Sequence, residues 1–426
     1  MFLYTFNKIK NISLKSGLIA NFPLKKNIKC IIIYYLCLFG GEVLKKNLNI
    51  GLLGFGAMGK AHAFSTSAVP YYYDGIEFSA NYRAVCTANP DNAKKVAELY
   101  SLGRACENED EVINDPEIDV IDICTPNIFH YESAKKAIAA GKHVLCEKPL
   151  AINPEQAVEL DALARKAFEE SGQVCGMVFN NRHLSSIKRA KELIDEGRLG
   201  KIISFDFKYL HNSCIDPERF AGWKQDKDIC GAGTLFDLGA HIVDLCRYLC
   251  GEFSEVYAKE QIAFPSHKRA DGSEWTTNAD EAVYMTATLE CGAVGTLTAG
   301  KINVGENDGL TFAIYGTEGS IKFDLMESDW LYFYDADADG GNYGGLHGFT
   351  KIECVGRYPS PAGKFPSPKA QNGWLRGHIG SMYSYLLAVA EGRQVSPSFE
   401  DGAKAQIILD AAHRSHLEGR AVKIEK

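Results

Sequence analysis

The feature that most constrains the fold is the segment 49–62, in which an apolar run leads into three glycines and then into helix-forming residues. Gly54, Gly56 and Gly59 form the pattern G-x-G-x-x-G. The first glycine permits a tight turn, the second lets backbone approach a pyrophosphate, and the third lets the helix pack on the strand. Because amide groups at a helix N-terminus attract an anion, the segment predicts a dinucleotide site in preference to a plain strand-to-helix turn.

Strands and helices alternate after this loop, and the alternation predicts a doubly wound, parallel α/β sheet. The helix after residue 153 has clear local signals, because Asn153 is a good N-cap and Pro154 suits a first helical turn. These elements define a Rossmann-type dinucleotide-binding domain over 48–180. Its further strands are predicted at Arg83–Cys86, Val120–Cys124, His143–Cys146 and Val174–Phe179.

Beyond a predicted helix at Ile187–Glu196 the pattern changes to longer alternating runs, which predict an open, largely antiparallel sheet. We therefore assign 181–426 to a second α/β domain. The segment 340–373 is rich in glycine and proline and predicts a long loop. The last predicted helices, Ile379–Glu391 and Asp401–Gly419, are expected to pack back on the first domain.

The size and charge of the chain restrict its partners. At 426 residues it exceeds one usual core, which agrees with two domains. A net charge of −8 argues against a nucleic-acid surface, because binding to polyphosphate depends on clustered Lys and Arg. We expect a small-molecule ligand, no membrane partner, and a homodimer or homotetramer formed through the uncovered face of the second sheet.

The cysteines are scattered singly through apolar runs, as at Cys86, Cys124, Cys146 and Cys175. No C-x-x-C pair occurs, so small buried thiols in a reducing compartment are favoured over disulfides or a metal site. We therefore expect a cytoplasmic protein.

Residues 1–47 differ in composition from the rest of the chain. Three lysines precede Cys30–Phe39, an apolar run of ten that resembles part of a signal peptide but is too short to span a bilayer. No small-residue cleavage site follows before Glu42. A disordered or wrongly included leader is favoured over export.

Three polar segments lie at the predicted carboxyl ends of strands or at a helix entry. Cys124-Thr-Pro-Asn127, with His130 beyond, follows one central strand and Glu147-Lys-Pro149 follows the next, where ligands bind in open α/β sheets. A helix-capping turn and a simple strand stop are the structural alternatives. Lys148 at this edge is placed to hold a substrate hydroxyl.

The third segment is glycine-rich and leads into a helix on which Asp237, His241 and Asp244 share one face. This stripe could be a solvated surface, but an imidazole one turn from a carboxylate fits a positioned general base with its partner. Metal binding is disfavoured because no further strong ligand is near in the sequence. Residues 335–340 resemble the start of a calcium-binding loop. We reject calcium binding there because Leu346 occupies the twelfth position of the loop, which requires a bidentate Glu.

Together these motifs resemble the glucose-fructose oxidoreductase and inositol dehydrogenase family (Gfo/Idh/MocA), from Leu48 to the C-terminus. The resemblance implies a dinucleotide-binding domain, an open-sheet domain, and NAD(P)-dependent oxidation of a ring hydroxyl of a sugar or cyclitol. The segments that carry it are Gly54-Phe-Gly-Ala-Met-Gly59, Thr125-Pro-Asn127 with His130, Glu147-Lys-Pro149, Phe179-Asn-Asn-Arg182, Asp237-x-x-x-His241 and Tyr315-Gly-Thr-Glu-Gly-Ser320.

Carried over by position, the resemblance implies that Lys148, Asp237 and His241 are catalytic. His241 would remove the alcohol proton, Lys148 would bind the same oxygen, and Asp237 would orient the group. Candidate sugar contacts, besides Asp237 and His241, are Arg182, Trp223 and Lys227, although Trp223 could be packing. Expected cofactor contacts are Gly54, Phe55, Gly56, Ala57, Met58, Gly59, Thr87, Thr125, Pro126, Asn127, His130, Glu147 and Lys148.

The sequence departs from the family at Thr87, where many members carry an acidic residue that binds the ribose 2′-hydroxyl. Because a carboxylate repels a 2′-phosphate, its absence beside Lys94 permits NADP, while Asp91 could still serve NAD. We expect NAD or NADP, with a slight preference for NADP. Two alternatives remain for the activity: a glycoside-cleaving enzyme of the same fold, and an NADP-binding sugar sensor without turnover, which the retained Lys148 and His241 disfavour.

Overall fold

The computed structural model describes residues 46–425, apart from 217–219 and 372. The predicted leader therefore lies almost wholly outside the described residues. Its last two positions do not belong to a leader, because the first described strand, β1, spans Lys46–Leu53 and begins two residues before the expected boundary. Lys46 is anchored there by a hydrogen bond from its Nζ to the Val389 carbonyl at 2.8 Å.

The first domain contains a six-stranded sheet in the order β3-β2-β1-β4-β5-β6, in which every neighbouring pair is parallel. This order is that of a doubly wound dinucleotide-binding sheet, so the predicted fold class is confirmed. Its central strands are almost continuously apolar because helices cover both faces. Besides β1 the strands are β2 Phe78–Cys86, β3 Arg104–Cys106, β4 Val120–Ile123, β5 His143–Cys146 and β6 Cys175–Met177.

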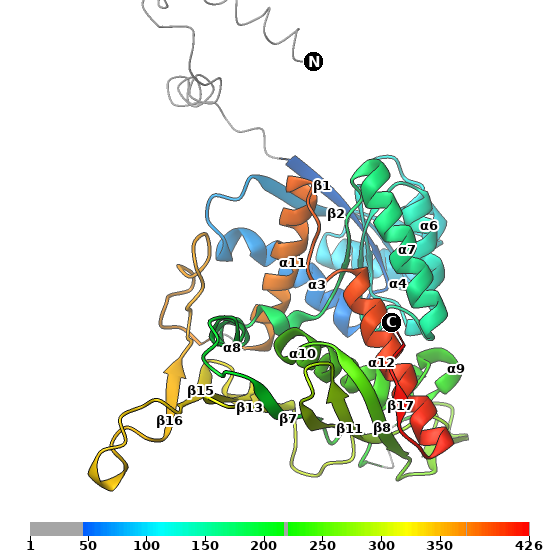
Figure 1. The fold of residues 1–426 in the computed structure, drawn as a ribbon. Helices are drawn as coiled ribbons and strands as arrows, with labels where there is room; N and C mark the ends of the chain where they lie inside the picture. The colour runs from blue at the N-terminus through cyan, green and yellow to red at the C-terminus, as the bar shows by residue number, and fades with distance from the viewer. Residues whose placement is uncertain (1–45, 217–219, 372, 426) are drawn as a thin grey trace, which may run out of the picture. The chain divides into compact units, whose positions relative to one another are not determined.

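Helices cover this sheet on both faces (Figure 1). Asn153 caps α7, Pro154–Ser171, by accepting from the Gln156 N–H, and Pro154 opens the helix, as the sequence predicts. The helix α11, Trp374–Glu391, starts five residues before its predicted position and packs on α3, Ala57–Tyr72. The remaining helices on this sheet are α3 Ala57–Tyr72, α4 Pro90–Tyr100, α5 Glu109–Ile113, α6 His130–Ala139 and α7 Pro154–Ser171.

The second sheet has nine strands in the order β16-β15-β14-β13-β7-β12-β11-β8-β17. Every neighbouring pair is antiparallel except β7 with β12, so the sheet is largely antiparallel, as predicted, but mixed. The strands are β7 Ile202–Leu210, β8 Phe253–Gln261, β11 Ala282–Leu289, β12 Val294–Gly300, β13 Gly309–Gly316, β14 Gly319–Asp324, β15 Trp330–Asp335, β16 Phe349–Glu353 and β17 Val422–Lys423; β9 Ser266–Lys268 and β10 Glu274–Thr276 form a separate hairpin.

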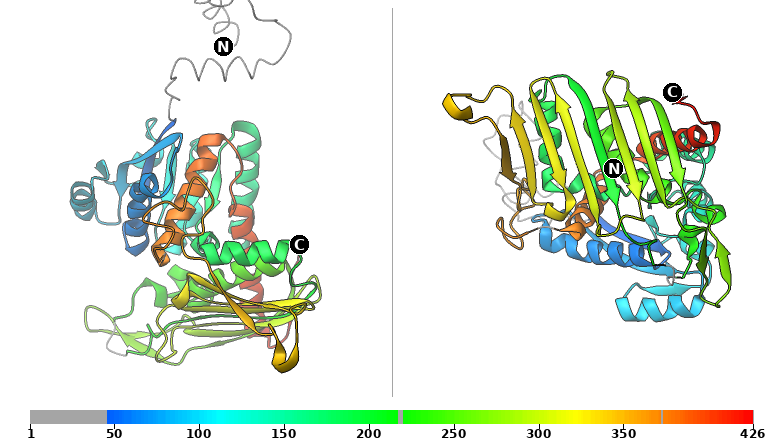
Figure 2. Two further views of the ribbon diagram at one scale, coloured as in Figure 1. Left: turned by 90° about the vertical axis from the view of Figure 1, so that its left-hand side faces the viewer. Right: turned by 90° about the horizontal axis from the view of Figure 1, so that it is seen from below.

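One face of the nine-stranded sheet carries α8 Ser185–Asp195, α10 Ala240–Cys250 and α12 Phe399–Glu418. The opposite face carries none of the described helices (Figure 2). Large apolar side chains are exposed on the strands, including Ile203, Tyr257, Tyr284, Val294 and Tyr315. Contact between subunits through this face remains a prediction.

The segment 340–373 is not wholly a loop. Phe349–Glu353 forms β16, which pairs with β15 and extends the sheet at its edge. The strand was missed because its side chains are mostly exposed and lack the alternation that a half-buried strand shows.

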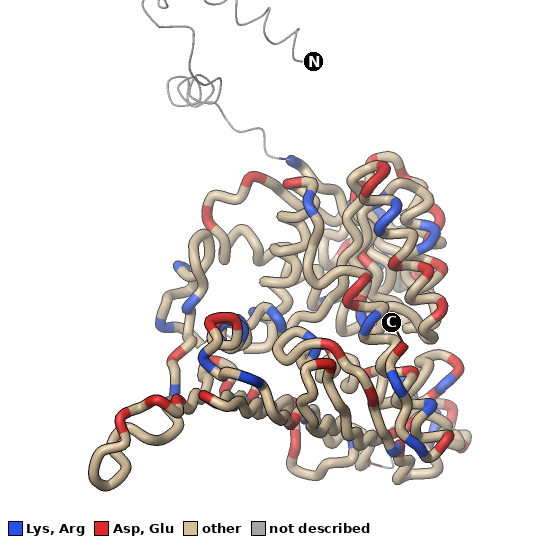
Figure 3. Tube along the Cα trace, in the orientation of Figure 1, with Lys and Arg blue, Asp and Glu red and all other residues tan. Residues whose placement is uncertain are grey.

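The charged residues are interspersed along the chain in the view of Figure 3. The stretch Lys227–Cys250 is long and apolar enough, by length and composition alone, to cross a membrane. However, 78% of its most apolar window is buried inside the fold, as in the core helix of a soluble domain. This burial explains its apolar composition.

Candidate active site

The three glycines of the loop differ in what an added side chain would contact at each position. Gly54 has φ +89°, and a Cβ there would lie 2.6 Å from the Cys124 carbonyl oxygen. A Cβ on Gly59 would lie 2.5 Å from the Gly54 carbonyl oxygen, so the helix can approach the strand only without one. Gly56 differs, because a Cβ there would meet nothing within 4 Å.

The open space at Gly56 fits a bound dinucleotide. Gly56 is the N-cap of α3, and no side chain caps the amide groups of that first turn. A helix N-terminus with unpaired N–H groups and room beside it suits a pyrophosphate. The residues present therefore fit the predicted cofactor.

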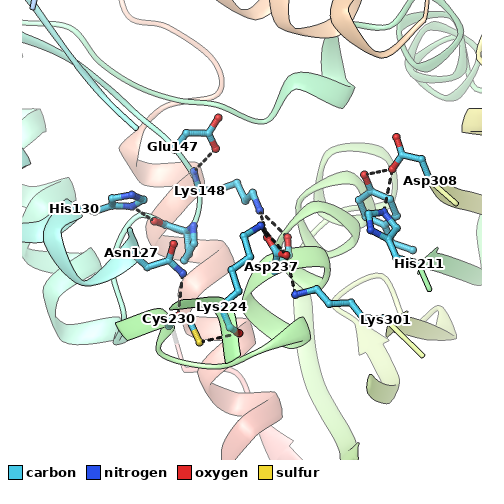
Figure 4. Close-up of polar contacts among 12 residues, drawn as sticks. Asn127, His130, Glu147, Lys148, His211, Lys224, Cys230, Asp237, Lys301 and Asp308 are labelled. Carbon is cyan, nitrogen blue, oxygen red and sulfur yellow. Dashed lines mark hydrogen bonds and ion pairs between the residues drawn. The ribbon is translucent and has the colours of Figure 1, made fainter. Parts of the chain in front are cut away.

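The loops after β4 and β5 are tied together by buried side chains. His130 is 1% exposed, and its ring nitrogens lie 2.7 Å from the Pro149 carbonyl and 2.9 Å from the Thr125 carbonyl. Asn127 donates to the Cys230 carbonyl at 2.9 Å and so links the first domain to the second (Figure 4). Their own side-chain contacts make both residues positioning groups for the neighbouring loops.

A cavity of about 450 Å³ lies beside Lys148 and is lined by both domains. Met58 of the glycine loop borders it, as do residues from the second sheet and from α11. Its basic and imidazole groups are Lys148, Lys224, Lys301, His211, His241 and His378, and its aromatic groups are Tyr209, Phe220, Trp223 and Trp374.

Three ammonium groups converge on the carboxylate of Asp237 (Figure 4). Lys148 Nζ donates to Oδ1 at 2.9 Å and to the Asp237 carbonyl at 2.8 Å. Lys224 Nζ lies 2.8 Å from Oδ1, and Lys301 Nζ lies 2.8 Å from Oδ2. Burial raises the pKa of Asp237, but the lysines outweigh it and hold that pKa well below its usual range. We call Lys148, Lys224, Asp237 and Lys301 the lysine cluster.

The backbone around Asp237 is irregular, and this irregularity presents the carboxylate to the cavity. Residues Leu235–Gly239 form a π-helical turn, η4, ahead of α10. Such turns are frequent at functional sites. Asp280 fixes the entry, because its carboxylate accepts from Gly233 N–H at 2.7 Å and from Leu235 N–H at 2.8 Å.

His241 lines the same cavity one turn beyond Asp237. Its ring packs edge-on against Tyr209, with ring centroids 5.6 Å apart. Burial and then the charge of Lys148 lower the pKa of His241 to about 3. The imidazole is therefore unprotonated near neutral pH and can accept a proton.

A second buried cluster lies on the other side of Lys148. His62 Nδ1 is 2.8 Å from Asp122 Oδ1, and its Nε2 is 3.0 Å from Glu147 Oε1. Burial lowers the pKa of His62, but Asp122 outweighs it, so that pKa is raised well above its ordinary value. The ring is thus an imidazolium between two carboxylates. Lys148 donates its backbone N–H to Glu147 Oε2 at 3.1 Å. We call His62, Asp122 and Glu147 the carboxylate cluster.

Comparison with known proteins identifies the family. Residues 48–170 match the model of the oxidoreductase family with an NAD-binding Rossmann fold, and residues 187–322 match the GFO/IDH/MocA C-terminal domain. Levoglucosan dehydrogenase of Pseudarthrobacter phenanthrenivorans is 34% identical over 381 residues, which cover 86% of this chain and 95% of that one. The chain belongs to the Gfo/Idh/MocA oxidoreductase family.

Two further relatives support the comparison. The structure of levoglucosan dehydrogenase in complex with NADH and levoglucosan matches this oxidoreductase with a TM-score of 0.83 at 33% identity, covering 89% of this chain and all of that one. Glucose-6-phosphate 3-dehydrogenase of Bacillus subtilis is 26% identical over 364 residues, which cover 85% of this chain and 94% of that one. The present chain is thus an oxidoreductase with an NAD(P)-binding Rossmann domain.

Some residues predicted for the site of this oxidoreductase do not reach the cavity. Arg182 is 6% exposed, and its guanidinium pairs with Asp244 and Asp401. Asp244 therefore pairs with Arg182 and does not line the cavity that Asp237 and His241 border. Lys227 donates to His413 Nε2 at 3.0 Å and lines a different cavity. The expectation of sugar contacts from Arg182 and Lys227 is corrected on these grounds.

Sequence reasoning missed several residues that border the cavity of this oxidoreductase. Lys301 directly follows β12, and Lys224 lies in η3, Trp223–Gln225, beside Trp223, which also lines the cavity. Neither lysine belongs to a recognisable motif. His378 and Trp374 are on the first turns of α11, and they were missed because the predicted helix began at residue 379.

Proposed function

We propose that this oxidoreductase oxidises a secondary ring hydroxyl of a sugar or a closely related polyol. The observation that carries the proposal is that an ammonium group, Lys148, and an unprotonated imidazole, His241, line one cavity beside the glycine loop. An alcohol that loses a hydride must also lose its hydroxyl proton, and these two groups suit that requirement. NAD or NADP supplies the hydride acceptor when bound.

In this proposal His241 accepts the hydroxyl proton of the substrate. Lys148 donates a hydrogen bond to the same oxygen and stabilises the negative charge that develops on it. Asp237 acts on Lys148 more than on substrate, because all the described polar contacts of its carboxylate are to lysines. Its part is to hold the Lys148 ammonium group in place. The expected contact of Trp223 with the sugar remains part of the proposal.

The class of substrate follows from the lining of the cavity and from the relatives. Tyr209, Trp223 and Trp374 supply aromatic faces, and lysines and imidazoles supply hydrogen-bonding groups, a combination that suits a hydroxylated ring. Levoglucosan dehydrogenase and glucose-6-phosphate 3-dehydrogenase are named for oxidation of carbohydrate substrates. We propose the same broad class for this chain.

The test is a substrate panel. The purified protein is mixed with NAD or NADP and with anhydrosugars, hexoses, sugar phosphates, glycosides and inositols, and reduced cofactor is followed by its absorbance. We expect turnover with at least one neutral or phosphorylated sugar and an oxidised sugar as the product. Release of an aglycone without net reduction of the cofactor would instead identify a glycoside-cleaving enzyme, and cofactor binding without turnover on any compound would identify a sensor.

We also propose that the enzyme is a cytoplasmic homodimer or homotetramer, assembled through the open face of the second sheet. Exposed Ile203, Tyr284 and Tyr315 on that face support the proposal. Light scattering tests it, and a monomer at micromolar concentration would contradict it.

A further inference from the structure

His378 is a buried polar side chain whose two ring nitrogens make no hydrogen bond to the described residues. The residue is 3% exposed, yet neither Nδ1 nor Nε2 has a hydrogen-bond partner within the described residues. It lines the cavity described above. Leaving such groups unpaired is costly, so a buried imidazole with two open positions indicates a bound partner outside the polypeptide.

The ring of His378 is held in place on both sides. Trp374, one turn earlier on α11, contacts it with ring centroids 4.2 Å apart, and His62 of α3 lies 6.1 Å away. Two glycines let α11 approach its neighbours closely. A Cβ on Gly377 would lie 2.8 Å from the Asn180 carbonyl, and a Cβ on Gly380 would lie 2.8 Å from the His183 side chain. The imidazole is therefore a rigid group, which suits ligand positioning.

The surroundings of His378 belong to the nucleotide-binding half of the cavity. One of its ring nitrogens lies within 4.8 Å of ligand atoms of His62 and Glu147, and α11 packs on α3, the helix that follows the glycine loop. Met58, in the same helix, also lines the cavity. The lysine cluster and His241 are contributed by other elements.

A metal ion does not explain the open positions. His62, Glu147 and His378 are close enough to be considered as ligands, but both nitrogens of His62 are already bonded, to Asp122 and to Glu147. Glu147 also accepts the Lys148 N–H. His62 therefore has no lone pair left for a metal, and the two remaining groups, Glu147 and His378, are fewer ligands than a protein metal site requires.

The chemistry of the imidazole defines the partner. Burial is the main cause that lowers the pKa of His378 to about 3, so the ring is neutral. A neutral imidazole has one N–H donor and one acceptor nitrogen. A primary carboxamide offers a carbonyl acceptor and an amide donor, and therefore complements it.

We propose that His378 binds the nicotinamide end of the cofactor, through the carboxamide group. This inference deepens the proposed function, because it assigns a residue of α11 to the same cavity. His378 thereby extends the cofactor site from the glycine loop of the first domain to a helix built from residues far along the chain.

The experiment compares two ligands that differ only in the nicotinamide. NADH and ADP-ribose share the adenosine, pyrophosphate and second ribose, but ADP-ribose lacks the nicotinamide ring. In His378→Leu we expect about tenfold weaker binding of NADH, the size expected for one or two lost hydrogen bonds, and unchanged binding of ADP-ribose. Fluorescence titration measures the first affinity and calorimetry the second, and neither needs turnover or a known substrate.

A graded variant and a matched control complete the test. His378→Gln keeps a donor and an acceptor, so it should recover part of the NADH affinity. His183→Phe alters a buried imidazole that packs on α11 and does not line the cavity, and it should leave the ratio of the two affinities unchanged. Retained ADP-ribose binding shows that the nucleotide domain is folded in each variant.

Three results would overturn the proposal. The first is unchanged NADH affinity in His378→Leu. The second is an equal loss for NADH and ADP-ribose, which indicates a general effect on the fold. The third is a higher KM for the sugar with unchanged NADH affinity, which would assign His378 to the substrate. Because the first two results are affinities measured without a sugar, failure of the sugar-oxidation proposal would not affect them.

Discussion

The two buried ionic clusters meet at Lys148 and have opposite compositions. In the carboxylate cluster one imidazolium is shared by two carboxylates, whereas in the lysine cluster one carboxylate is shared by three ammonium groups. Lys148 contributes its backbone N–H to the first and its Nζ to the second. A single residue therefore connects an excess of negative charge on one side with an excess of positive charge on the other.

The clusters also differ in access. His62 and Asp122 are nearly inaccessible and do not border the cavity, and Glu147 is 4% exposed at its edge, whereas Lys148, Lys224 and Asp237 line it. Burying charges is costly unless each is paired, so the first cluster should act mainly on stability. Charges that border the cavity can act on the charge that develops in a reaction there, so the second should act mainly on rate.

The largest expected effect is on the rate. Lys148→Ala and His241→Ala should each lower kcat by about 10²- to 10⁴-fold, because they remove the hydrogen-bond donor and the proton acceptor. NADH binding, measured by fluorescence titration, should remain. Asp206→Asn is the control. Asp206 lies on β7, where its carboxylate accepts a hydrogen bond from the Thr296 hydroxyl, and this variant should keep full activity. Full activity of either cavity variant would remove its assigned role.

The second largest expected effect is on the stability of the fold and concerns the carboxylate cluster. His62→Leu leaves Asp122 and Glu147 buried without a counterion, which should cost about 3–5 kcal/mol. For a domain of this size the melting temperature should fall by roughly 10 °C. Adding Asp122→Asn and Glu147→Gln removes the remaining charges and should restore much of the loss. If the triple variant melts as low as the single one, packing and not charge determines the effect.

The carboxylate cluster should give stability a particular dependence on pH. Because the folded pKa of His62 is raised, its contribution is complete below the ordinary value of 6.5 and is lost as the pH rises through the raised value. Burial raises the pKa of Glu147, but His62 outweighs it and lowers that pKa to about 2. The contribution of Glu147 is therefore present above 4.5 and lost only as the pH falls toward 2. The difference in melting temperature between wild type and His62→Leu should shrink from pH 6.5 to 9.5, and a widening difference would contradict this account.

Within the lysine cluster, burial should decide whether the ammonium group of Lys301 or that of Lys224 has the larger effect on kcat/KM. The side chain of Lys301 is 7% exposed and that of Lys224 is 46% exposed, although both contact Asp237 at 2.8 Å. Water screens the exposed pair. Lys301→Met should lower kcat/KM about tenfold and Lys224→Met at most about threefold. The reverse order would show that Lys224 contacts the substrate directly.

The smallest expected effect concerns the cofactor. Thr87 has no carboxylate to repel a 2′-phosphate, and its hydroxyl already donates to the Asn89 carbonyl at 2.7 Å. We expect less than a tenfold difference between NAD and NADP, in favour of NADP. Titration with both cofactors measures it, and a tenfold or greater preference for NAD would overturn the expectation.

Short motifs were sufficient to locate the centre of the site, because a glycine loop, a strand end and a helix entry each carry local signals. They identified Lys148, Asp237 and His241, which the fold brings to one cavity. The parallel, doubly wound class of the first sheet followed from alternation, whereas the order of its strands and the short edge strand β3 did not. The roles of these residues remain predictions.

The parts that could not be predicted depend on contacts between distant segments. Arg182 has a motif-like position, but only the tertiary fold shows that Asp244 and Asp401 neutralise it. Lys301 is an ordinary residue after a strand until the fold sets it against Asp237. The π turn at Asp237 also has no sequence periodicity that distinguishes it from a regular helix.

The position of α11 has a consequence for how the enzyme comes into existence. The helix α11 supplies Trp374 and His378 to the lining of the pocket. It packs on α3, the helix that follows the glycine loop near the beginning of the described chain. A ribosome that has finished the nucleotide-binding strands has still not produced His378 or Trp374. The growing polypeptide therefore passes through most of its synthesis without a complete catalytic chamber, and activity begins only after the late-made helix has docked.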